Sequence, residues 1–100
     1  MSSWPIYVRT IERPGSFKRD YKREVKGPHR RILDAVLVPV LRALALDQAL
    51  PSRFRDHDLN GDWVDHRECH LKPDLLLIYQ KVGSELLILV RLGSHSELFG

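Results

Sequence analysis

The chain of 100 residues has room for one domain, which we expect to span 1–100 around a single hydrophobic core. Its 43% hydrophobic and 29% charged residues are typical of a globular protein, and no apolar stretch reaches the ~20 residues that a membrane-spanning helix needs. Sixteen Lys and Arg against thirteen Asp and Glu give a net charge of +3, which favours a polyanion or an acidic partner but also suits plain solubility.

Two further features concern the cellular compartment. The single cysteine, Cys69, excludes an internal disulfide and is typical of a reducing environment. The first residues lack the basic start and the apolar run of a signal peptide. We therefore expect a cytoplasmic protein with no membrane partner.

The first 46 residues predict a short strand and two helices. A β-prone run at 6–10 precedes a helical pattern that we expect to begin at the N-cap Ser16 and to end before Gly27. A second helical pattern covers 30–46, where Pro39 predicts a kink or a break because proline cannot donate a hydrogen bond. The first pattern has an apolar face and a basic surface, formed by Phe17, Tyr21 and Val25 and by Lys18, Arg19, Lys22, Arg23 and Lys26, respectively.

The second half of the chain predicts strands. Polarity and turn residues place them at 53–57 (a short edge segment), 63–71, 75–79 and 86–90. The last two runs are apolar throughout, which is typical of central strands, and the short gap at Gly83-Ser84 predicts an antiparallel hairpin. The fold class is therefore α+β, with two N-terminal helices packed on a small, twisted, mainly antiparallel sheet in the order β-α-α-β-β-β.

Imidazoles and carboxylates are concentrated in the last 45 residues. On the strand predicted to end near position 71, Glu68 and His70 share one face, whereas Cys69 and Leu71 share the face that we expect the helices to cover. Asp74 follows at the start of the next strand, where we expect it close to His70. Together these side chains suit general acid–base catalysis, although each alone is better explained as a surface, capped or turn residue.

A metal site is the first alternative for the same residues. His66, Cys69 and His70 resemble zinc ligands, but a tetrahedral site would also need His57 or His95. The His-x-x-x-His spacing moreover lies on a predicted strand, not on the helix that this motif requires. We therefore expect no metal and no cofactor. On the first helix, five cations against two acids favour phosphate binding over a merely solvated surface.

Two stretches of the chain closely resemble the YafQ branch of the RelE/ParE toxin superfamily. The first is 50–79, with Asp56-His57-Asp58-Leu59-Asn60-Gly61-Asp62-Trp63 and Arg67-Glu68-Cys69-His70-Leu71-Lys72-Pro73-Asp74; the second is the ending Arg91-Leu92-Gly93-Ser94-His95-Ser96-Glu97-Leu98-Phe99-Gly100. The segment 17–23 is similar to that family's first helix. The resemblance implies a RelE-like toxin fold and catalytic roles for His57, Glu68, His70, Asp74, His95 and Phe99. Glu68 stands where we expect an aspartate.

The resemblance also implies partners and a mechanism. Family members are ribosome-dependent mRNA endonucleases, so the 70S ribosome and mRNA are expected partners, together with a DinJ-like antitoxin of the ribbon-helix-helix type that alone carries the toxin to operator DNA. In the expected reaction, His70 and His95 share the base and acid roles in attack by the RNA 2′-hydroxyl. Asp74 and Glu68 would tune the imidazoles, His57 would steady the phosphate and Phe99 would stack on a base. Ribosomal RNA would be bound by Lys18, Lys22, Arg23 and Lys26.

Three other functions stay open on the sequence alone. A ParE-like toxin shares this fold but binds DNA gyrase without cutting RNA, and the histidine-rich ending argues against it. A metal-dependent nuclease would lose its activity in the presence of a chelator. A decayed toxin would keep the residues but not the activity.

Overall fold

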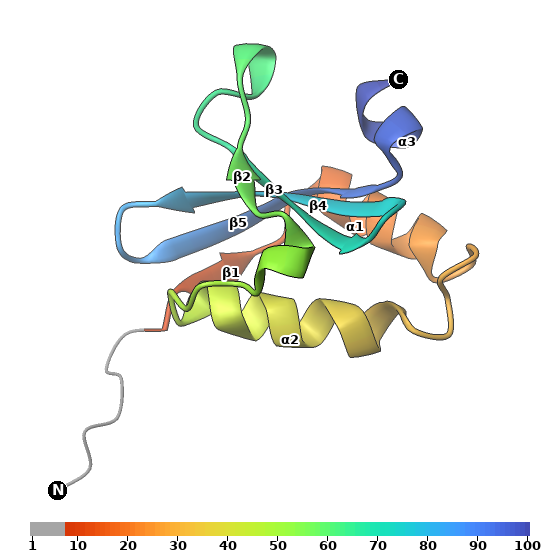
Figure 1. The fold of residues 1–100 in the computed structure, drawn as a ribbon, viewed down its shortest axis with the longest axis horizontal. Coiled ribbons are helices and arrows are strands. Elements are labelled where there is room, and N and C mark those ends of the chain that lie inside the picture. The colour runs from red at the N-terminus through yellow and green to blue at the C-terminus, as the bar shows by residue number, and fades with distance from the viewer. Residues whose placement is uncertain (1–7) are drawn as a thin grey trace, which may run out of the picture.

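The computed structural model describes residues 8–100 (Figure 1). Its strands are β1 (Thr10–Glu12), β2 (His57–Asp58), β3 (Arg67–Lys72), β4 (Leu75–Val82) and β5 (Leu86–Gly93). Its helices are α1 (Gly15–Glu24), α2 (Leu33–Ala45) and α3 (His95–Phe99), with single 3₁₀ turns at Ser52–Phe54 and Gly61–Trp63. The predicted α+β class is confirmed, and α3 is an addition that the sequence reading did not include. The strand predicted at 6–10 begins only at Thr10, and positions 6 and 7 lie outside the described residues.

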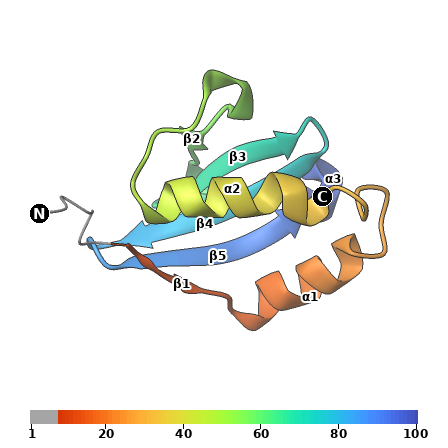
Figure 2. The ribbon, with the colours of Figure 1, turned by 90° about the horizontal axis from the view of Figure 1, so that it is seen from below.

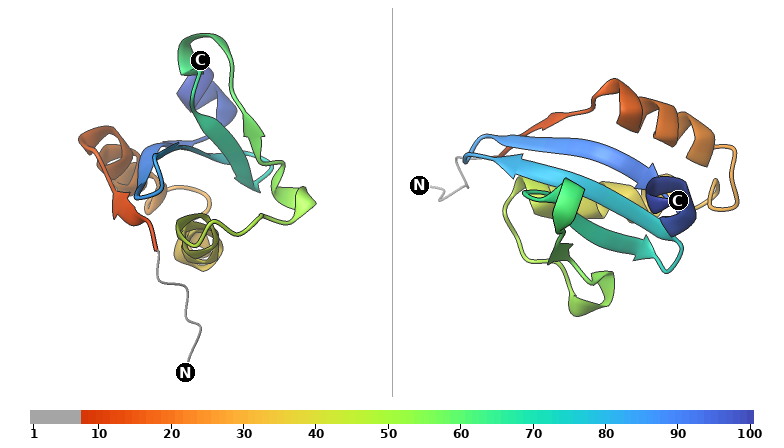
Figure 3. Two further views of the ribbon diagram at one scale, coloured as in Figure 1. Left: turned by 90° about the vertical axis from the view of Figure 1, so that its left-hand side faces the viewer. Right: turned by 90° about the horizontal axis from the view of Figure 1, so that it is seen from above.

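The five strands form one sheet in the order β1-β5-β4-β3-β2. β1 is parallel to β5, whereas all other neighbours are antiparallel, including the predicted β4–β5 hairpin. Helix α2 crosses one face of the sheet, and α1 lies along its β5 side (Figure 2). The segment around β2 and helix α3 rise on the opposite face (Figures 1 and 3). That second face therefore carries the parts of the chain in which the sequence predicts chemistry.

Burial on both faces of β4 explains its apolar sequence. Leu75, Leu77 and Tyr79 pack in the main core with the helices, whereas Leu76 and Ile78 form a smaller cluster with Leu98 of α3. All five β4 residues are at most 1% exposed. Cys69 and Leu71 also lie in the main core, as predicted from the strand alternation. The opposite side chains of β3 are therefore directed to the second face.

Helix α1 departs from its predicted form. Ser16 does not cap it, because the N-cap residue is Pro14 and the Ser16 hydroxyl instead donates to the Val90 carbonyl at 2.9 Å. The predicted apolar face is also shorter than expected, since Val25 is 39% exposed. In place of a longer apolar stripe, α1 buries two carboxylates, Asp20 and Glu24, against the sheet.

Helix α2 begins at Leu33, later than the predicted position 30, and continues without a break through Pro39. Of the predicted kink or break, the break was wrong and the kink stays a prediction. Pro39 lies on the exposed side of the helix, where water can bind the carbonyl that loses its backbone partner. The buried residues Leu37, Val40 and Leu44 on the other side fix the helix to the sheet. No helix within residues 8–100 is long and apolar enough to span a bilayer.

Candidate functional site

One carboxylate lies between two imidazoles at the β2–β3 end of the second sheet face. The register of the two-residue strand β2 sets His57 opposite Glu68, and His70 is two residues further along β3. The Glu68 Oε2 atom lies 3.4 Å from His57 Nε2 and 3.2 Å from His70 Nε2. Glu68 is only 5% exposed, so neighbouring atoms rather than water fix its position. The predicted pair Glu68 and His70 thus shares one face, joined there by His57.

The backbone before β2 fixes the ring of His57. Its Nδ1 atom lies 2.6 Å from the carbonyl oxygen of Arg55, while Nε2 faces Glu68. A carbonyl and a carboxylate are both acceptors, so each ring nitrogen of His57 faces a group that can accept a hydrogen bond. These two contacts fix the orientation of the ring.

A partly buried network holds the chain on either side of His57. Arg67 donates to Asp56 at 3.2 Å and to Asp58 at 2.6 Å, and the Tyr79 hydroxyl donates to the same Asp56 oxygen at 2.6 Å. Burial, followed by this hydrogen bond, raises the pKa of Tyr79 well above its ordinary value. Burial alone would lower the pKa of Arg67, but its hydrogen bonds to Asp56 and Tyr79 outweigh that effect and raise it. Both side chains therefore keep one protonation state and serve to place β2.

Helix α3 supplies the second part of the site. It begins with a capping box, in which the Glu97 amide donates to the Ser94 hydroxyl at 3.2 Å and the Ser94 amide donates to Glu97 at 2.8 Å. Leu98 anchors the helix in the smaller apolar cluster. The ring centroids of His95 and Phe99 are 4.9 Å apart, and Phe99 is 38% exposed. A signal for this helix was present in the sequence, because Ser-x-x-Glu is the capping-box pattern.

The two parts lie on the same face of the sheet. In register, His70 is opposite Leu76 on β4, which in turn is opposite Gly93 on β5, two residues before His95. Two strand spacings separate His70 from Gly93, about 10 Å between Cα atoms. Leu76 between them is only 1% exposed, because it packs in the smaller apolar cluster with Leu98 and Trp63. Within residues 8–100, the ring contact of His95 is with Phe99, whose ring also lies 6.1 Å from that of Trp63, and none joins His95 to His57 or His70. β2 and β3 therefore lie on one side of this covered strip and α3 on the other (Figure 3).

Two predicted neighbours of this group have other partners. Asp74, expected beside His70, is 70% exposed at its side chain, and its Oδ1 atom lies 2.9 Å from Nε2 of His29 in the α1–α2 connection. His29 was not singled out from the sequence, because nothing in its local pattern marks it. His66 precedes β3, and its ring packs edge-on against Trp63 at 5.3 Å. It therefore contributes to the support of the loop.

The thiol of Cys69 is not available for metal binding. It lies on the helix side of β3, on the opposite face from His70, and burial raises its pKa to about 12. Within residues 8–100, no group of three or more His, Cys, Asp or Glu side chains is arranged to bind a metal ion.

The basic helix α1 lies across the sheet from the Glu68 group, along β5 (Figures 2 and 3). Lys18, Lys22 and Lys26 are exposed there, and within residues 8–100 they form no ion pair. Arg23 differs from them, because it donates to Asp20 at 3.0 Å, to Glu24 at 3.1 Å and to the Leu92 carbonyl at 2.6 Å. Its guanidinium also forms an ion pair with Glu97 of α3 at 3.1 Å.

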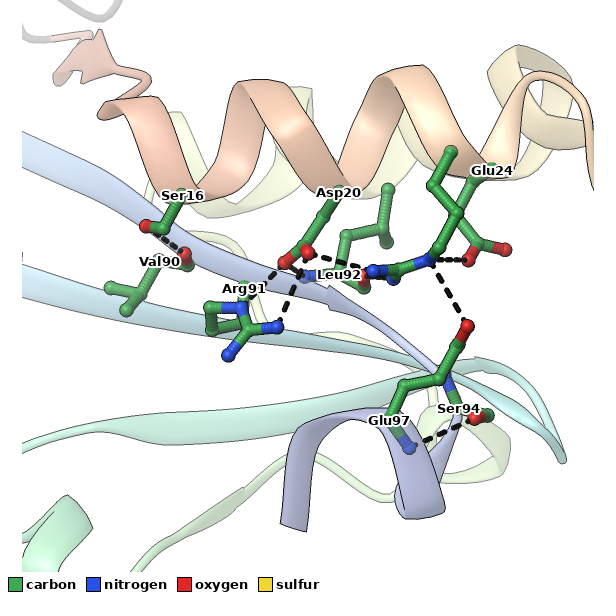
Figure 4. A network of polar contacts seen from close by, with 9 residues as sticks. Ser16, Asp20, Glu24, Val90, Arg91, Leu92, Ser94 and Glu97 are labelled. Atoms are coloured by element: carbon green, nitrogen blue, oxygen red, sulfur yellow. Dashed lines mark hydrogen bonds and ion pairs between the residues drawn. The ribbon is translucent and has the colours of Figure 1, made fainter. Parts of the chain in front are cut away.

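Asp20 is the centre of this second network (Figure 4). Its carboxylate accepts from Arg91 at 2.6 and 3.2 Å and from the Leu92 amide at 2.9 Å. Burial alone would raise the pKa of Asp20, but the hydrogen bonds from Arg91 and Leu92 and the nearby guanidinium of Arg23 outweigh it and lower the pKa. Together with Ser16, these side chains take the place of a neighbouring strand along β5 beyond the end of β1.

Comparison with known proteins gives the same class from sequence and from structure. The chain is 35% identical over 92 residues to the mRNA interferase toxin YafQ of Escherichia coli strain K12, covering 90% of this chain and 99% of that protein. A metal-bound toxin from Helicobacter pylori superimposes with a TM-score of 0.81 at 49% identity, covering 91% and 99% of the two chains. For the toxin chain of the E. coli DinJ–YafQ complex the TM-score is 0.79 at 35% identity, covering 92% and 98%.

These likenesses define a small bacterial toxin with a RelE-like fold. The family model described as a bacterial toxin of type II toxin–antitoxin systems, YafQ, matches residues 9–100. The chain therefore belongs to the YafQ toxin family, which confirms the resemblance stated from the sequence.

Proposed function

We propose that this chain is an mRNA interferase, a metal-independent endoribonuclease that cuts translated mRNA on the ribosome and thereby inhibits translation. The observation that carries the proposal is the Glu68 carboxylate, which lies 3.4 and 3.2 Å from the imidazoles of His57 and His70. Imidazoles exchange protons near neutral pH, so their placement beside a buried acceptor suits acid–base chemistry. The E. coli relatives named mRNA interferase toxins support the same activity.

The proposed reaction transfers two protons. A base removes the proton of the RNA 2′-hydroxyl, whose oxygen attacks the adjacent phosphorus, and an acid protonates the departing 5′-oxygen. The products are a 2′,3′-cyclic phosphate and a 5′-hydroxyl. We assign the two roles to His70 and His95, which lie on the same face of the sheet on either side of the smaller apolar cluster. Each proton transfer contributes ~10²–10⁴-fold to the rate. Phe99 offers an exposed ring beside His95 on which an unpaired base can stack.

The remaining site residues act on this pair. Glu68 orients the imidazoles by accepting at Oε2, and its extra methylene, relative to aspartate, brings that oxygen within reach of both rings. His57 steadies the scissile phosphate with the ring that Arg55 and Glu68 fix. Asp74 lies in the turn between β3 and β4, where it is bound to His29, and its proposed role is to orient an imidazole of the site.

The proposed partners follow from family membership and from charge. The E. coli DinJ–YafQ complex supports a DinJ-like antitoxin of the ribbon-helix-helix type for this chain in the cytoplasm, and contact with operator DNA would pass through that complex. Lys18 and Lys22 are exposed on α1 and Lys26 just after its end, and all three suit contacts with ribosomal RNA phosphates. Arg23 contributes less to such contacts, because carboxylates already surround it.

The test compares His70→Ala and His95→Ala with the control Glu85→Ala, which changes an exposed residue in the turn between β4 and β5. Primer extension on mRNA after induction should show discrete cuts for the wild type and the control and none for the two variants. All four proteins should unfold at similar temperatures. Normal cutting by both variants would contradict the mechanism. Gyrase inhibition without cuts would identify a ParE-like toxin, and loss of cutting with a chelator would identify a metal-dependent nuclease.

A further inference from the structure

A pocket of about 340 Å³ opens directly beside the Glu68 group. One wall is the 3₁₀ turn Ser52–Phe54 with the following Arg55, and the other is the end of β3 from His70 to Pro73. His70 therefore faces Glu68 on one side and this pocket on the other. We call it the Arg53 pocket, after the first of its lining residues.

The Arg53 pocket is lined by cations and by no acidic residue. Arg53, Arg55 and Lys72 contribute three positive charges, and within residues 8–100 none of them forms an ion pair. The arginines of the neighbouring networks differ in this respect, since Arg67 and Arg91 are each bound to aspartates. Arginines that are paired with carboxylates stabilise the fold, whereas unpaired cations around a concave site are suited to bind a polyanion.

The turn that presents these cations is fixed to the candidate catalytic group. Arg55 has a φ of 51°, in the left-handed region that a residue with a Cβ enters at a cost of about 1 kcal/mol or more. This conformation directs its carbonyl to His57, at 2.6 Å from Nδ1. The guanidinium of Arg53 lies 4.7 Å from the centre of the Phe54 ring, which restrains that side chain as well. The pocket and the His57 ring therefore share one rigid support.

We infer that the Arg53 pocket binds the phosphate of an RNA nucleotide that adjoins the scissile bond. The inference rests on the proposed function, because the scissile phosphate is placed at His70. A pocket of this volume that continues from His70 can hold one nucleotide, with Phe54 and Pro73 as apolar walls and Arg53, Arg55 and Lys72 around the phosphate. The ligand is thus the mRNA strand itself.

Three exposed arginines outside the site provide the comparison for a test. Arg13, Arg31 and Arg42 do not line the Arg53 pocket, and within residues 8–100 none of them forms an ion pair. This control set and the pocket set of Arg53, Arg55 and Lys72 carry equal charge. Replacing either set with glutamine lowers the net charge by three, which separates a local site from a general charge effect.

The experiment measures binding of a short single-stranded RNA with 2′-O-methyl riboses, which cannot be cut, by fluorescence anisotropy without ribosomes. The pocket triple variant should bind at least about tenfold more weakly, and the slope of log K against log[salt] should fall by about 2, close to 0.7 for each of three lost contacts. The control triple variant, with glutamine at positions 13, 31 and 42, should bind the oligonucleotide within about twofold of the wild type. Thermal unfolding should be unchanged for both variants, because the substituted side chains have no ion-pair partners within residues 8–100.

The inference is overturned if both triple variants lose affinity equally, if the pocket variant binds normally, or if the wild type does not bind the oligonucleotide at low salt. Cleavage of ribosome-bound mRNA is measured separately, with a raised KM and little change in kcat expected for the pocket variant. Failure of the wild type to cut mRNA would sink the proposed function, whereas the oligonucleotide result tests the pocket by itself.

Discussion

Asp20→Asn tests whether the network between α1 and β5 stabilises the fold. The Asp20 side chain is 5% exposed and accepts hydrogen bonds from Arg91, Arg23 and the Leu92 amide. Asparagine keeps one acceptor oxygen but turns the other into an amide that faces donors. It also leaves two guanidinium groups without their shared counter-charge.

The size of the expected loss in unfolding free energy depends on how exposed the two arginine partners of Asp20 are. Loss of one member of a buried ion pair costs about 3–5 kcal/mol. Arg91 and Arg23 are 28% and 39% exposed, so water screens part of this loss. We therefore expect the free energy of unfolding to fall by about 2–3 kcal/mol. For a domain of this size the melting temperature should fall by roughly 10–20 °C.

Urea unfolding followed by circular dichroism measures this change, with Asp65→Asn as the control. Asp65 is exposed and its φ of 70° also suits asparagine, so the control should stay within about 0.5 kcal/mol of the wild type. The pKa of Asp20 is lowered in the folded state from its ordinary value of 3.8. The contribution of Asp20 to stability is therefore fully present above pH 3.8 and is lost as the pH falls through the lowered pKa. The gap between wild type and Asp20→Asn should therefore narrow only in strong acid. A loss below about 1 kcal/mol at pH 7 would refute the reasoning.

Three further predictions concern the site and the core beneath it. Ser94→Ala removes the capping box of α3 and should cost about 1 kcal/mol in unfolding experiments while lowering the cleavage rate, and an unchanged rate would show that α3 needs no cap. Glu68→Gln leaves a neutral acceptor between the imidazoles, so kcat should fall and the pH–rate profile should shift, whereas an unaltered profile would exclude coupling to His57 and His70. Cys69, with a pKa of about 12 in the core, should resist iodoacetamide at pH 8 until the protein unfolds, which mass spectrometry can follow; rapid labelling of the native protein would contradict its burial.

The longest hydrophobic patterns gave correct predictions, because the spacing of their apolar residues determines which side chains are buried. The apolar run in β4 is buried on both faces, and the alternation around Cys69 assigns the correct side to Glu68. Errors arose where tertiary contacts replace local ones. Ser16 has the residue type of a cap but binds Val90, 74 positions away, and Pro39 is tolerated because it faces water.

The sequence suggested which residues form the candidate site, and their roles stay predictions; it did not show how these residues are connected. His57 pairs with Glu68 through a two-residue strand, which is too short to leave a sequence pattern. The bond between Asp74 and His29 joins positions 45 apart and has no local signal. The cations of the Arg53 pocket come from a turn and from the end of β3, so no periodicity unites them. Helix α3, in contrast, carried a readable signal at its first turn.

The side chains of α1 that complete the β5 edge have a consequence for synthesis. The Leu92 amide that donates to Asp20 lies 72 positions further along the chain, so α1 of a nascent chain meets its buried partner only after β5 has left the exit tunnel. Arg23 then joins the same helix to α3, which bears His95 and Phe99. A product terminated before β5 would leave the Asp20 carboxylate in water, without the donors that hold α1 on the sheet.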